Sequence, residues 1–139
     1  MQTIIEFCQQ FVNEQACVDY LENARWRGQV ECPLCAGQRV YHCSTRFLLK
    51  CAICQKQFNV RTGTILGDSR LPLRKWFIAI YLLDKEPQIA SSIQIAKRLD
   101  ITQKSAWKML KKLSPYLDVA PNSTSPDFDE VVRRVVTSI

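Results

Sequence analysis

The sequence lacks several features on which common functional assignments depend. None of its apolar runs approaches the ~20 residues that a membrane span requires. The first residues carry Glu6 and no basic segment, which argues against a secretory signal. Glycine is scarce, with 4 in 139 residues, and neither a glycine-rich phosphate loop nor an internal repeat is present. We therefore expect no membrane partner and no small-molecule substrate.

Cysteine, by contrast, is frequent. The chain has 7 cysteines, and an odd number without a leader fits a reducing cytoplasm and metal binding better than a disulfide framework. Four of them form two Cys-x-x-Cys pairs, and this spacing lets two tight turns aim four thiolates at one tetrahedral ion. The predicted ligands of one structural Zn²⁺, with no open position for catalysis, are Cys32, Cys35, Cys51 and Cys54.

Other interpretations of the cysteines remain open at this point. The two pairs could form two disulfides or be four unrelated buried thiols. His42 and Cys43 are alternative ligands, although a strand through them would place their side chains on opposite faces and outside both turns. Cys8 and Cys17 lie on apolar helical stripes, and we expect them to be buried core thiols.

The hydrophobic pattern predicts an α+β chain in which a small three-stranded zinc ribbon is preceded by two short helices and followed by a three-helix helix-turn-helix unit. The predicted divisions are a helical lead over 1–28, the ribbon over 29–66, the helix-turn-helix domain over 70–117, and a linker with a short C-terminal tail over 118–139. Within them we expect helices over 3–12 and from the N-cap Asn13 to about Asn23, strands over 39–43, 46–50 and 58–62, and a short amphipathic helix over 127–139.

The helix-turn-helix prediction depends on one stretch of sequence. Pro72 suits the first position of a core helix that ends before Pro87, and two further helices follow over 91–99 and 102–113. Thr102 can cap the helix over 102–113, and Asp100 stands in the turn before it, where glycine is usual. The alternative is an ordinary three-helix core whose lysines are merely solvated.

The charge distribution suggests a polyanion as partner. The formal net charge is +6, and the basic residues concentrate in 37–75, which has eight of them against Asp68 alone, and in 97–112. Such a cationic region usually binds nucleic acid, although a soluble charged surface remains an alternative. Our candidate DNA contacts lie in the helix over 102–113, with its cap, and among the basic ribbon residues. They are Thr102, Gln103, Lys104, Trp107, Lys108, Lys111, Arg39, Arg46, Lys50, Lys56 and Arg61.

Several short motifs occur together in a familiar order. They are Arg25-Trp26, the two Cys-x-x-Cys pairs, Phe58, Gly63-Thr64-Ile65, Pro72-Leu73, Trp76-Phe77 and Lys104-Ser105-Ala106-Trp107. Over about residues 7–117 this order resembles the N-terminal region of bacterial insertion-sequence transposases of the DDE type, which open with a zinc ribbon. The resemblance implies DNA binding at the element's terminal repeats. In that family, a separate nuclease domain of RNase H-like fold follows and performs strand transfer.

Only 22 residues follow Leu117, too few for an RNase H-like domain. Asp127, Asp129 and Glu130 lie within four positions, whereas two-metal chemistry needs carboxylates from separated elements. We therefore expect a truncated or free-standing DNA-binding portion that is not an enzyme.

The expected partners are double-stranded DNA and either a second copy of this chain or a full-length transposase. The expected location is the bacterial cytoplasm, on the nucleoid. The alternatives are a regulatory module acting on a transposase or transcription complex, and RNA binding through the aromatic residues Tyr41, Phe47 and Phe58.

Overall fold

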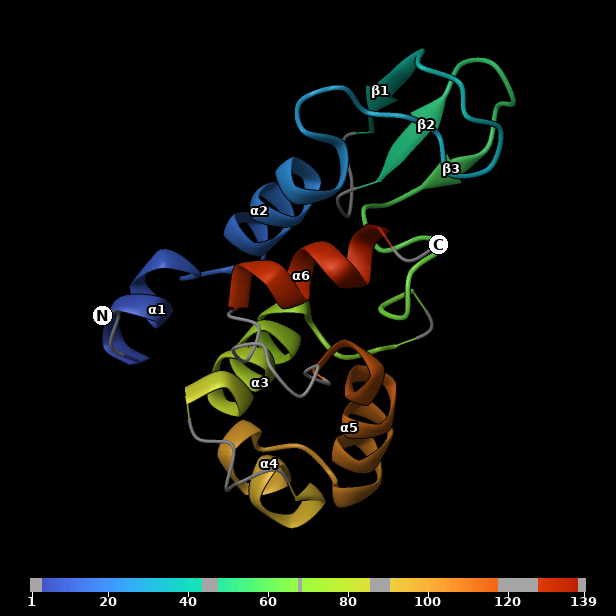
Figure 1. Cartoon of the computed structure of the whole chain (residues 1–139). Helices are drawn as coiled ribbons and strands as arrows, with labels where there is room; N and C mark the ends of the chain where they lie inside the picture. The colour runs from blue at the N-terminus through green and yellow to red at the C-terminus, as the bar shows by residue number, and fades with distance from the viewer. Residues whose placement is uncertain (1–3, 44–47, 68, 86–90, 118–127, 138–139) are drawn as a thin grey trace, which may run out of the picture. The chain divides into compact units, whose positions relative to one another are not determined.

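The computed structural model describes residues 4–43, 48–67, 69–85, 91–117 and 128–137 (Figure 1). The chain divides into two compact units, one formed by Met1–Arg70 with Val136–Ile139 and the other by Leu71–Val135. The predicted α+β class with a three-stranded antiparallel sheet is confirmed. The four predicted domain boundaries stay a prediction. Among the described helices, none is both long and apolar enough to cross a membrane.

The first unit begins with two helices, α1 (Ile4–Gln10) and α2 (Glu14–Trp26). Asn13 caps α2 as predicted, since its side-chain oxygen accepts a hydrogen bond of 2.9 Å from the Ala16 backbone N–H. The helix extends past the predicted end at Asn23 and terminates at Arg27, which has φ 48°. Cys17 is fully buried, as expected, whereas Cys8 is only half-buried.

The sheet has the order β1-β2-β3 and consists of β1 (Val40–His42), β2 (Leu49–Cys51) and β3 (Gln57–Phe58). Val40 pairs with Cys51, and Leu49 pairs with both His42 and Phe58. Leu49, Cys51 and Phe58 form a small core with Cys32, against which Trp26 packs. The ring centroids of Trp26 and Phe58 are 6.1 Å apart in a T-shaped arrangement, which joins α2 to the sheet.

The third strand is shorter than predicted. We expected it to continue to residue 62, but it ends at Phe58. The Asn59 N–H donates to Thr62 Oγ1 at 3.0 Å, and the Thr62 N–H donates to the Asn59 carbonyl at 3.1 Å. These bonds close a turn directly after the strand, so the strand predicted over 58–62 is wrong beyond Phe58.

The second unit contains α3 (Leu73–Lys85), α4 (Ser92–Leu99), α5 (Gln103–Leu117) and most of α6 (Phe128–Thr137). The helix α3 begins one residue after Pro72 rather than at it, and most of its apolar side chains are buried, as predicted for a core helix. Ser91 caps α4, and Asp100 ends it with φ 55° and ψ 52°. The helix α5 runs four residues beyond the predicted end and includes Pro115.

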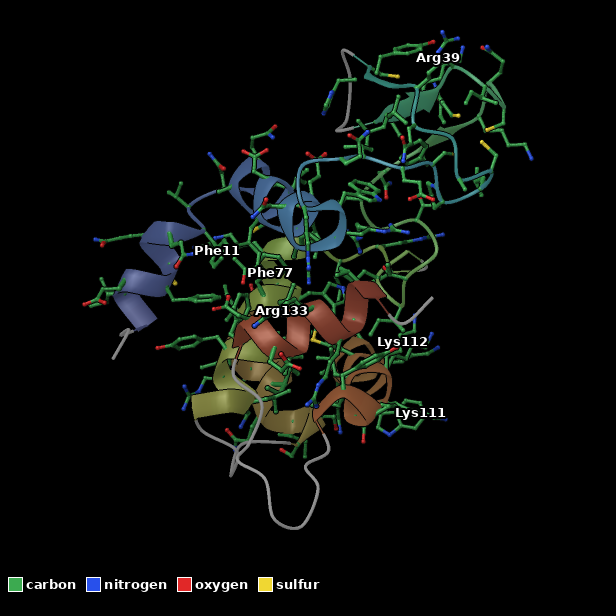
Figure 2. All side chains as sticks on the ribbon, turned by 45° about the horizontal axis from the view of Figure 1, so that its top comes forward. Phe11, Arg39, Phe77, Lys111, Lys112 and Arg133 are labelled. Carbon is green, nitrogen blue, oxygen red and sulfur yellow. The ribbon has the colours of Figure 1, made fainter. Side chains whose placement is uncertain are left out.

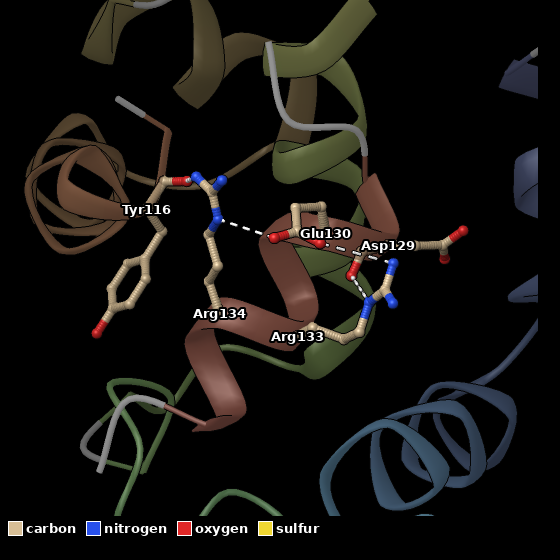
Figure 3. A network of polar contacts seen from close by, with 5 residues as sticks. All are labelled: Tyr116, Asp129, Glu130, Arg133 and Arg134. Carbon is tan, nitrogen blue, oxygen red and sulfur yellow. Dashed lines mark hydrogen bonds and ion pairs between the residues drawn. The ribbon is translucent and has the colours of Figure 1, made fainter. Parts of the chain in front are cut away.

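The C-terminal helix α6 packs within this second unit. Its residues Val131, Val132 and Val135 are buried, and the ring of Phe128 makes a T-shaped contact with Phe77 at 5.3 Å. Arg134 Nη1 donates to the Tyr116 carbonyl at 3.5 Å (Figure 3). The described part of the C-terminal tail, residues 128–135, is thus docked on the second unit.

Candidate functional site

The four predicted metal ligands converge in the first unit. The sulfur atoms of Cys32, Cys35, Cys51 and Cys54 all lie within 4.8 Å of one another. The Cys32–Cys54 and Cys35–Cys51 sulfur distances are 3.8 Å and 3.5 Å. Tetrahedral zinc with Zn–S bonds of about 2.3 Å requires sulfur separations of roughly 3.8 Å. The donor set and its spacing therefore fit one structural zinc.

The first Cys-x-x-Cys turn is held by backbone hydrogen bonds. The Leu34 N–H points at Cys32 Sγ at 3.4 Å, and the Ala36 N–H donates to the Cys32 carbonyl at 2.8 Å. Ala36 has φ 63°, in the left-handed region, which turns the chain back towards the sheet. An N–H aimed at a sulfur stabilises the thiolate form that a metal binds.

The second turn repeats the first with the same geometry. The Ile53 N–H lies 3.4 Å from Cys51 Sγ, the Gln55 N–H donates to the Cys51 carbonyl at 2.9 Å, and Gln55 has φ 64°. The two turns meet at Gly37, where an added Cβ would lie 2.7 Å from Ile53 Cδ1 and 3.3 Å from Cys51 Sγ. Gly37 therefore permits the close approach that brings the two thiol pairs together.

The surroundings shift the pKa values of two of the four thiols in opposite directions. Hydrogen bonds from the Cys54 and Ile53 backbone N–H groups lower the pKa of Cys51 to about 7. The backbone of Gly37 acts in the same direction on Cys35, but its three neighbouring sulfurs and burial outweigh it and raise the pKa of Cys35 to about 12. Four sulfurs this close cannot all be thiolates without a cation between them.

Neither alternative ligand joins this cluster. Among the described residues, the metal-binding group consists of the four cysteines. The side chain of His42 is 71% exposed, and its Nε2 lies 4.0 Å from Glu22 Oε1 on α2. Cys43 is half-buried, and its backbone N–H bonds the Leu48 carbonyl.

The candidate reading face lies on α5 in the second unit. Its six predicted residues are all exposed: Thr102, Gln103, Lys104, Trp107, Lys108 and Lys111. Thr102 caps α5 as predicted, because its Oγ1 accepts from the Ser105 backbone N–H at 3.1 Å. Gln103 Nε2 donates to Ser92 Oγ of α4 at 3.3 Å, and this bond links the start of α5 to α4. On the opposite side Ala106, Met109 and Leu113 are buried.

Three of the basic ribbon candidates are accessible. Arg39 and Lys56 are exposed and Lys50 is partly exposed, whereas Arg46 lies outside the described residues. Figure 2 shows Arg39 at the margin of the sheet. Arg61 differs, because its Nε donates to the Leu66 carbonyl at 2.9 Å and its Nη2 to the Ser69 carbonyl at 3.0 Å. Whether any of these side chains contacts DNA stays a prediction.

Sequence reasoning gave Arg25 no role, but the structure shows one. Its Nη1 donates to the Val60 carbonyl at 2.8 Å, and its guanidinium lies 5.0 Å from the centre of the Trp26 ring. Partial burial lowers the pKa of Arg25. Arg25 thus ties α2 to the segment after the ribbon. The Arg25-Trp26 motif was the available signal, although a partner 35 residues away could not be read from it.

Comparison with known proteins identifies the metal-binding part. Residues 12–57 match the family model of the transposase zinc-ribbon domain. The chain carries a transposase-type zinc ribbon. This match and the four-cysteine cluster confirm the resemblance inferred from the motifs and the prediction of one structural zinc.

The transposase-type zinc ribbon also has a curated relative. Over 114 residues the chain is 32% identical to the "uncharacterized protein in transposable element ISH50" of Halobacterium salinarum. The match covers 78% of this chain and 37% of the relative, so the chain spans little more than a third of that protein's length. No solved structure matches the chain.

Proposed function

We propose that this chain is a zinc-stabilised module that binds double-stranded DNA at the ends of a transposable element. The single observation that carries the proposal is the outward face of α5. It presents three lysines, a glutamine and a tryptophan on one exposed side, and α5 contains no acidic residue. The preceding turn at Asp100 gives α4 and α5 the connection of a helix-turn-helix.

The chemistry of this face suits the major groove. The N-terminal residues of a recognition helix meet base edges, and a glutamine can pair with adenine while lysines bind guanine or phosphate. The bond from Gln103 to Ser92 restricts the glutamine before any DNA is present. Binding at this face would place the protein on the nucleoid of a bacterial cytoplasm.

In this proposal the ribbon contacts the phosphate backbone of the DNA. Arg39, Lys50 and Lys56 carry positive charge on or next to the small sheet, and phosphate contacts position a protein without reading sequence. We assign Arg61 to structure instead, because two carbonyls already occupy its guanidinium.

We further propose that these residues alone do not perform strand transfer. Glu130 Oε1 pairs with Arg134 Nε at 3.1 Å and its Oε2 with Arg133 Nη2 at 3.6 Å, so α6 uses this carboxylate internally (Figure 3). A plasmid nicking assay with Mg²⁺ or Mn²⁺ tests this point, and cleavage above a control without the added divalent ion would contradict it.

Selection of bound duplexes from a random pool tests the main proposal. We expect wild-type protein to enrich a common sequence and to lose affinity steeply with added salt. Lys104→Ala should weaken binding to the selected duplex by about 1–3 kcal/mol if it contacts a base edge. Arg133→Ala on α6 removes the same charge and should change binding little. Salt-independent binding, or no binding to any duplex, would refute the proposal.

A further inference from the structure

The most unusual exposed side chain of the second unit is Trp107. Its surface is 53% exposed, although it lies in the second turn of a fifteen-residue helix. The core beneath α5 is filled by Ala106, Met109 and Leu113, each at most 1% exposed. Packing of α5 therefore does not need the indole, and its exposed ring is available for a contact outside the chain.

The neighbours of Trp107 indicate what kind of partner it meets. Lys104 and Lys111 lie three residues before and four residues after it, so both flank the indole on the helix surface, and Lys108 follows it directly. Lys111 extends outward from α5 (Figure 2), and its Nζ lies 4.9 Å from the centre of the Trp107 ring. An apolar ring surrounded by cations is complementary to an apolar group within a polyanion.

The direction of the side chain matters as well. Long side chains on a helix lean towards its N-terminus, so Trp107 covers the surface over Gln103 and Lys104 rather than the turn that follows. The N-terminal half of α5 is the part that would enter a major groove. The ammonium group of Lys111 over the ring restrains the indole in this position.

From this arrangement we propose that Trp107 reads thymine by packing its indole against the C5-methyl group in the major groove. The inference rests on the proposed function, because it requires α5 to lie in that groove. The thymine methyl is the apolar group that the major groove displays, and it distinguishes a thymine edge from other bases. Gln103, one turn before the indole, would then face a neighbouring base pair of the same site.

The experiment uses the duplex selected by the wild-type protein, with each thymine replaced in turn by uracil. This change removes one methyl group and keeps every hydrogen-bonding group. We expect at least one replacement to weaken wild-type binding about four-fold, which corresponds to about 0.8 kcal/mol for one buried methyl group. Trp107→Ala should bind the selected duplex less tightly and lose all sensitivity to that replacement, with its salt dependence unchanged.

Two variants control for structure. Trp107→Phe keeps an aromatic ring and should retain part of the discrimination, whereas Ile93→Ala removes another exposed apolar side chain, 51% exposed on α4, and should retain all of it. Circular dichroism should show the same helix content in each variant. If no duplex is bound, both the proposed function and this inference fail. If the duplex is bound with a steep salt dependence but uracil has no effect, or Trp107→Ala stays sensitive, only the role of Trp107 fails.

Discussion

At the residue scale, the cysteines of the ribbon differ sharply in what they contribute. Cys51 is fully buried, its sulfur lies 3.5 Å from that of Cys35, and it accepts the Ile53 N–H. Cys51→Ser replaces a thiolate ligand with a poor one, so we expect loss of the bound zinc and unfolding of the sheet, since zinc contributes about 10–16 kcal/mol to such small domains. Metal content and thermal unfolding of the purified variant measure both effects.

Cys43→Ser is the matched control for that prediction. Cys43 directly follows β1 and lies outside the four-sulfur cluster, so this variant should still bind one zinc per chain and unfold near the wild-type temperature. Loss of zinc from the Cys43 variant, or retention of zinc by the Cys51 variant, would show that the ligand set is wrong.

A second residue-scale prediction concerns Glu22. The pKa of Glu22 is raised, mainly because the side chain is partly buried. The charge of His42 lowers this pKa, and the charge of Asp19 raises it. The folded protein therefore holds this proton more tightly than the unfolded chain, and wild-type stability falls as pH rises from the unfolded pKa through the folded one. Glu22→Gln removes the buried charge. It should be more stable than wild type above this window and equally stable below it.

Urea unfolding at pH values on both sides of the window checks the Glu22 prediction. Glu31→Gln changes an exposed carboxylate within the ribbon and should show no such pH-dependent difference. A Glu22→Gln variant less stable than wild type at neutral pH would indicate that the contact with His42 outweighs the cost of burial.

At the element scale, the features that sequence could predict are those set by neighbouring residues. The caps Asn13 and Thr102 and the two metal-binding turns follow from side chains and spacings within a few positions. The partner of Arg25 could not be predicted this way, because it lies 35 residues away. The end of β3 is set by a local turn between Asn59 and Thr62, but the alternating apolar pattern over 58–62 favours a longer strand and conceals that turn.

The turn between α4 and α5 gives a prediction at this scale. Asp100 adopts left-handed backbone angles, and the Ile101 N–H donates to the Ala96 carbonyl at 3.1 Å to close the helix end. Replacing Asp100 by glycine or by alanine removes the same carboxylate but changes the cost of this conformation. We expect the glycine variant to be more stable than the alanine variant by about 1 kcal/mol, measured by urea unfolding. Equal stabilities would mean that the turn relaxes to other angles.

At the scale of the whole molecule, the two units depend on different sources of stability. The ribbon has a small core built around Leu49 and Phe58 together with two of the zinc ligands, so we expect it to need the metal to fold. The second unit buries most of α3 along with Ile95, Leu99 and Met109, and the described residues there include no metal-binding cluster. Removing zinc should therefore unfold the ribbon and leave the helices of the second unit formed.

This difference allows the contributions of ribbon and reading face to DNA binding to be separated in one protein. With zinc removed by a strong chelator under reducing conditions, we expect weaker binding and a shallower salt dependence, by about 0.9 in slope for each phosphate that the unfolded ribbon no longer neutralises. The preference for the selected sequence should persist, because α5 carries it. Binding measured with and without chelator, for the selected duplex and a scrambled one, checks this. Loss of the sequence preference on removal of zinc would show that the ribbon, and not α5, recognises the sequence.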